Sequence, residues 1–106
     1  MTSPMPQVAA EILVRLREAG FPAEGAANRS VLALAEEAGE FVGAYRRWSG
    51  QARRTGTFDE MGAELADVVI CAWMAAAELG IDLDAAIAGK LAVIFDRGWR
   101  EEEPES

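Results

Sequence analysis

Two short acidic motifs hold the residues best suited to chemistry, and all their side chains are carboxylates. The first motif is Glu36-Glu37-x-x-Glu40 and the second is Glu64-x-x-Asp67. In an α-helix each residue advances by about 100°, so residues three or four apart project from the same side. Oxygen donors without His or Cys favour hard divalent cations, Mg²⁺ first and Mn²⁺ second. These five residues therefore predict a cation site.

Placing these charges together has a cost, and the cost argues for a cation. Like charges three or four residues apart weaken a helix by a few tenths of a kcal/mol per pair. Apolar neighbours such as Phe41 and Val68 add a desolvation cost. No Lys or Arg lies within one turn of the motifs at Glu36-Glu37 or Glu64-x-x-Asp67. The alternative is that each acidic face is solvated surface, but two such motifs on neighbouring helices favour a metal site.

Four helices are expected to position these residues, which makes the fold class all-α. The predicted spans are 6–19, from Asn28 or Ser30 to Trp48, 58–79 and 84–97. Apolar residues recur at helical spacing in them, and glycines follow the first, third and fourth. Thr57 is the expected N-cap of the third helix. The connecting segment 49–57 is an exposed loop, short enough to make the second and third helices antiparallel neighbours.

The third predicted helix is apolar almost all round after Asp67, which predicts burial at the centre of a bundle or an oligomer. The run Leu65–Ala77 is too short to span a bilayer. Within it, Trp73 is expected in the core and Cys71 as a small buried hydrophobe. We therefore expect a four-helix bundle subunit that forms a homodimer or homotetramer.

Composition excludes several classes of function. The 106 residues suit one domain, here 1–100, followed by an acidic tail at 101–106 that is expected to be disordered. The formal net charge of -8 disfavours nucleic acid and anionic membranes as partners. One cysteine and no histidine exclude an intrachain disulfide, a Cys/His zinc site and His-based nucleophilic catalysis. No signal peptide is visible, so a cytoplasmic protein is expected.

The paired motifs resemble the signature of the MazG-like nucleoside triphosphate pyrophosphohydrolases, in the all-α NTP pyrophosphatase superfamily. The resemblance covers about residues 28–99. It is carried by 34–41 and 64–69, with Lys90, Arg97 and Trp99 resembling the family's C-terminal helix. It implies cleavage of a nucleoside triphosphate between the α- and β-phosphates, giving a monophosphate and pyrophosphate, in a role such as house-cleaning of non-canonical nucleotides.

The resemblance also implies roles for single residues. Mg²⁺ would be ligated by Glu37, Glu40, Glu64 and Asp67. Glu36 would orient or deprotonate the attacking water. Lys90 and Arg97 are candidates for the triphosphate, with a solvated helix face as their alternative.

Three questions stay open from the sequence. Many relatives carry an Asn near the C-terminal Lys, but no Asn follows Asn28 here, which leaves the nucleotide's identity open. Four arginines near the predicted loop either meet a nucleotide or keep the loop soluble: Arg46, Arg47, Arg53 and Arg54. The alternatives to a general pyrophosphohydrolase are a non-catalytic helical interaction protein with a structural cation and a phosphoribosyl-ATP pyrophosphatase-like enzyme.

Overall fold

The computed structural model describes residues 3–99, and it confirms the all-α fold class. The helices are α1 (Met5–Glu18), α2 (Ala26–Trp48), α3 (Phe58–Leu79) and α4 (Leu83–Arg97). Residues 3–99 contain no strand. The predicted acidic tail, 101–106, lies outside the described residues.

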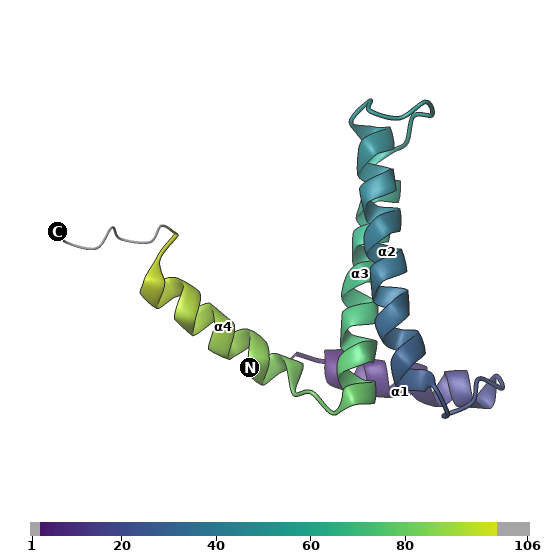
Figure 1. The fold of residues 1–106 in the computed structure, drawn as a ribbon, viewed down its shortest axis with the longest axis vertical. Helices are drawn as coiled ribbons and strands as arrows, with labels where there is room; N and C mark the ends of the chain where they lie inside the picture. Colours follow the sequence, from purple (N-terminus) through teal and green to yellow (C-terminus); the bar gives the residue numbers. More distant parts are fainter. Residues whose placement is uncertain (1–2, 100–106) are drawn as a thin grey trace.

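Helices α2 and α3 form a long antiparallel hairpin, which is the main packed unit of the chain (Figure 1). The start of α3 is fixed as predicted, because the Thr57 hydroxyl accepts a hydrogen bond from the Glu60 backbone N–H at 3.1 Å. The Glu60 carboxylate in turn accepts one from the Thr57 N–H, which completes a capping box. Gly80, with φ 71°, ends α3 in the left-handed conformation that glycine adopts without strain.

Helix α1 lies across the base of the hairpin and packs against α3 (Figure 1). Ala9 is buried in this contact region. Arg17 of α1 donates a hydrogen bond to Glu78 of α3 at 2.9 Å, and both side chains are partly shielded from solvent. This ion pair connects the base of the hairpin to the N-terminal helix.

Helix α4 extends away from the hairpin rather than along it (Figure 1). Its first turn is capped by the Asp82 carboxylate, which accepts from the Ala85 N–H at 3.1 Å. None of its residues is buried, although Leu91, Val93 and Phe95 are large and apolar. Its apolar surface is therefore uncovered within one chain.

The core of the described chain is thin. Apart from Trp73, every buried residue is an alanine: Ala9, Ala26, Ala44, Ala75 and Ala76. The Cα radius of gyration is 17.8 Å, whereas a compact domain of this length has about 13 Å. Among residues 3–99, no helix combines the length and apolar character that a bilayer crossing requires.

Two local predictions differ from the structure. Helix α2 begins at Ala26, earlier than either predicted cap, because Gly25 takes a positive φ of 75° and starts the helix two residues before Asn28. Cys71 is half-buried rather than fully buried, because it lines an apolar pocket. Trp73 is buried as predicted.

Candidate metal centre

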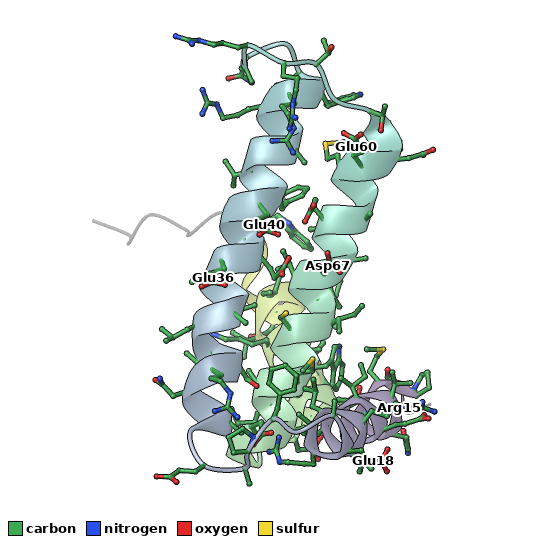
Figure 2. All side chains as sticks on the ribbon, turned by 90° about the vertical axis from the view of Figure 1, so that its right-hand side faces the viewer. Arg15, Glu18, Glu36, Glu40, Glu60 and Asp67 are labelled. Carbon is green, nitrogen blue, oxygen red and sulfur yellow. The ribbon has the colours of Figure 1, made fainter. Side chains whose placement is uncertain are left out.

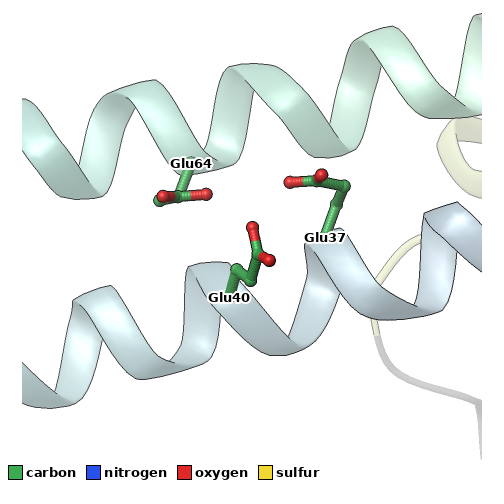
Figure 3. Close-up of side chains that lie close together, drawn as sticks. All are labelled: Glu37, Glu40 and Glu64. Atoms are coloured by element: carbon green, nitrogen blue, oxygen red, sulfur yellow. The ribbon is translucent and has the colours of Figure 1, made fainter.

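The hairpin brings three of the predicted carboxylates together in the space between its two helices. Oxygen atoms of Glu37, Glu40 and Glu64 all lie within 4.8 Å of one another. The first two side chains come from α2 and the third from α3, and all three reach into the gap between the helices (Figure 3). The antiparallel arrangement produces this convergence, because it sets the middle of α2 against the first half of α3.

Two of these carboxylates are partly removed from water without a hydrogen-bond partner. Glu37 and Glu64 are half-buried, and Glu40 is exposed. The Oε2 atoms of Glu37 and Glu64 are enclosed and lack a partner within the described chain. Enclosed carboxylate oxygens are costly unless a donor or a cation satisfies them. The geometry therefore fits a small cation with oxygen ligands.

The electrostatics of the carboxylate group also favour a bound cation. Burial raises the pKa of Glu37 above its ordinary value, and the negative charge of Glu40 raises it further. The charges of Asp67 and Glu64 add smaller contributions in the same direction. No Lys or Arg forms an ion pair with these residues in the described chain, whose ion pairs are Arg15–Glu11 and Arg17–Glu78. No ion pair with a basic side chain therefore relieves this repulsion within residues 3–99.

The other two predicted acidic residues lie at the edge of this group. Asp67 is exposed on α3, and Glu40 and Asp67 lie on the facing sides of the two helices (Figure 2). Asp67 is outside the group within 4.8 Å, although its charge is close enough to raise the pKa of Glu37. Glu36 is exposed on α2, one turn before Glu40, and is also outside the group.

The two predicted phosphate-binding residues lie on α4, apart from the carboxylates of the same chain. Lys90 and Arg97 are both exposed. Because α4 leads away from the hairpin, a single chain does not bring these cations to the carboxylate group (Figure 1).

Two hollows border the group along the hairpin. Towards α1 lies an apolar pocket of about 190 Å³, whose lining includes Ala33, Cys71 and Met74. Ala33 precedes Glu37 by four residues and Cys71 follows Asp67 by four, so the pocket begins about 6 Å along each helix. Towards the loop lies a more polar cleft of about 330 Å³, lined by Arg47, Arg54, Thr55, Glu60 and Glu64.

The two hollows were not predicted from the sequence. Four-residue spacing shows only that Ala33 lies one turn from Glu37 and Cys71 one turn from Asp67. The loop arginines were recognisable as a group, but the path of the loop, which the sequence does not predict, decides that Arg54 lines a cleft with Glu64.

Cys71 responds to the same charges. Burial raises the pKa of its thiol, and the charges of Glu37, Asp67 and Glu40 raise it further. The thiol therefore lies within the electrostatic range of the carboxylate group.

Comparison of the chain with protein-family models, with curated proteins and with solved structures found no match.

Proposed function

We propose that this chain is a Mg²⁺-dependent nucleoside triphosphate pyrophosphohydrolase, with house-cleaning of non-canonical nucleotides as one role it could serve. The observation that carries the proposal is the convergence of Glu37, Glu40 and Glu64 from two helices. The particular reaction comes from the resemblance of the paired acidic motifs to the MazG-like enzymes. The products would be a nucleoside monophosphate and pyrophosphate.

The residues of the group fit Mg²⁺ better than a softer metal. All donors are carboxylate oxygens, and the chain has no histidine. The enclosed Oε2 atoms of Glu37 and Glu64 supply two unsatisfied acceptors, which is the environment a cation would relieve. Mn²⁺ fits the same donors.

Each acidic residue has a distinct part in this proposal. Glu37, Glu40 and Glu64 hold the cation, with Asp67 as the fourth ligand at the rim. Glu36, exposed beside them, orients the water that attacks the α-phosphorus and accepts its proton. When bound, Mg²⁺ supplies positive charge and fixes the orientation of the phosphate oxygens.

The same proposal requires association with further copies of the chain, as a homodimer or homotetramer. Large apolar side chains are uncovered on both α3 and α4, and Leu65 and Val69 are 46% and 49% exposed. Exposed large apolar side chains such as these favour an interaction face. Lys90 and Arg97 would then reach the triphosphate from α4 of another copy.

The exposed apolar faces also favour a second candidate, a non-catalytic helical interaction protein with a structural cation. A phosphoribosyl-ATP pyrophosphatase-like activity is the alternative within the same superfamily.

The test is pyrophosphate release from a panel of canonical, deoxy and damaged nucleoside triphosphates, with phosphoribosyl-ATP included. We expect turnover with Mg²⁺ or Mn²⁺ that Glu37→Gln and Asp67→Asn abolish while circular dichroism shows an intact fold. Glu18→Gln, an exposed position on α1, is the matched control and should keep full activity. No turnover of any nucleotide with either metal would refute the enzyme and leave the interaction protein.

A further inference from the structure

The cleft at the loop end of the hairpin opens directly from the carboxylate group, because Glu64 belongs to both. Its other lining residues come from the end of α2, the loop and the first turn of α3. Glu60 lies one turn before Glu64 on α3, about 6 Å nearer the loop, and Figure 2 shows it at the loop end of the hairpin. A ligand bound at the carboxylates would therefore extend into this cleft.

Arg47 is positioned to face the carboxylates. It follows Glu40 by seven residues, so it lies on the same side of α2, two turns and about 10 Å further on. Its Nη1 atom folds back along the helix, 3.4 Å from the place where a Cβ on Gly43 would be. Its guanidinium is therefore turned towards Glu40, in the direction that helical side chains usually take.

Gly56 brings the loop close against Arg47. A Cβ at position 56 would lie 2.9 Å from the Arg47 Cβ and 3.2 Å from Glu60 Oε2. Real Cβ atoms do not approach so closely, so a larger residue would push the loop away from α2. The loop backbone at Gly56 therefore lies against the half-buried Arg47 side chain at the wall of the cleft.

The segment that supplies the arginines is positive, although the whole chain is acidic and Glu60 and Glu64 also line the cleft. Residues 41–58 contain four arginines and no Asp or Glu. Arg47 and Arg54 take no part in the ion pairs of residues 3–99. By contrast, the two arginines that line the apolar pocket at the α1 end already have partners within the chain. Arg17 forms an ion pair with Glu78, and Arg29 donates hydrogen bonds to the Glu24 and Pro22 carbonyls.

We propose that this cleft binds the pyrophosphate portion of the substrate, the β- and γ-phosphates, through Arg47 and Arg54. The inference rests on the proposed function. In that reaction the water oxygen bonds to the α-phosphorus, and the bond from the α-phosphorus to the bridging oxygen breaks. Pyrophosphate leaves with that electron pair, and the proton from water goes to Glu36.

The two guanidinium groups stabilise the charge that develops on the departing phosphate, through charge-assisted hydrogen bonds. The Thr55 hydroxyl is a further donor in the cleft. Glu60 opposes an anion there, but the Thr57 N–H holds its carboxylate in the capping box.

The experiment measures the binding of inorganic pyrophosphate to the full chain by calorimetry, with Mn²⁺ present. Arg47→Gln and Arg54→Gln should each weaken pyrophosphate binding about tenfold, the effect of losing one charge-assisted hydrogen bond. Arg53→Gln is the matched control, because Arg53 is an exposed loop arginine that does not line the cleft. It should change the affinity less than twofold. Affinity for Mn²⁺ alone should stay the same in all three variants.

The outcomes separate this inference from the proposed function. If no nucleotide is hydrolysed but pyrophosphate binding depends on Arg47 and Arg54, the enzyme is refuted and the cleft stands as a diphosphate site. If nucleotides are hydrolysed but both variants bind pyrophosphate as the wild type does, the cleft is refuted. It is also refuted if Arg53→Gln weakens binding as much as they do, or if the wild type binds no pyrophosphate. Arg54→Gln alone decides the matter if Arg47→Gln unfolds.

Discussion

Replacing Glu40 by Gln should stabilise the metal-free chain and weaken its response to Mg²⁺. Two unit negative charges 4.8 Å apart, the limit found for this group, repel by about 1 kcal/mol in water and by about 3.5 kcal/mol at an effective dielectric constant of 20. Because Glu40 is exposed, the lower figure applies to its repulsion with a neighbouring carboxylate of the group. Gln and Glu have similar helix propensities, so neutralising the charge is the main change.

The expected gain of about 1 kcal/mol corresponds to a rise in Tm of roughly 4–8 °C. With Mg²⁺ bound, the wild type should become the more stable of the two proteins. At a concentration of about 100 times Kd, the wild type gains about 2.7 kcal/mol, whereas a variant with tenfold weaker affinity gains about 1.4 kcal/mol. Thermal unfolding followed by circular dichroism at pH 7.5, with and without Mg²⁺, measures both effects.

The matched control is Glu36→Gln, one turn earlier on α2 and outside the close group. It should change the metal-free Tm little and leave the Mg²⁺ response as in the wild type. The reasoning fails if Glu40→Gln is no more stable than the wild type without metal, or if its Mg²⁺ response is undiminished.

Three further results are expected. The pKa of the Cys71 thiol should lie above its ordinary 9.0 in the metal-free chain, because of burial and the charges of Glu37, Asp67 and Glu40, and Mg²⁺ should lower it. The rate of thiol alkylation against pH measures this pKa. A midpoint at or below 9.0 without metal would contradict the prediction. Burial and Glu40 raise the pKa of Glu37 above 4.5 in the folded chain. Ionising Glu37 therefore costs no folding stability below pH 4.5, and the loss of stability increases as pH rises through the raised pKa. The Tm advantage of Glu37→Gln over the metal-free wild type should thus grow from pH 4.5 to 7.5, and a constant difference would count against it. Thr57→Ala should cost about 1 kcal/mol in unfolding free energy by removing the capping box, while Thr57→Ser should cost far less; equal losses in chemical denaturation would refute the cap's role.

The sequence predicted the elements where local chemistry determines them. Helix α3 begins after Thr57 and ends at Gly80, because a hydroxyl cap and a left-handed glycine are local features. The predicted start of α2 was wrong because a glycine such as Gly25 can either begin a helix or interrupt it. The residue pattern alone does not decide between these two roles.

Helical periodicity also explains how far the carboxylates were predictable. Spacings of three and four residues correctly gather Glu37 with Glu40 on one side of α2. They do not determine how each helix is rotated about its axis, which depends on the packing of Ala44 and Trp73 in the thin core. That rotation encloses Glu64 and leaves Asp67 exposed. Periodicity likewise does not predict that the apolar residues of α4 stay uncovered within one chain.

The thin core and the unrelieved carboxylate repulsion become coupled if the proposed association occurs. Leu65 and Val69 are one turn apart on α3 and flank Asp67 in sequence. A second copy that covered these two side chains would also remove water from the neighbouring carboxylates, which raises the cost of leaving their charges uncompensated. Association would therefore increase the affinity for a cation. By thermodynamic reciprocity, the cation would strengthen association by the same factor.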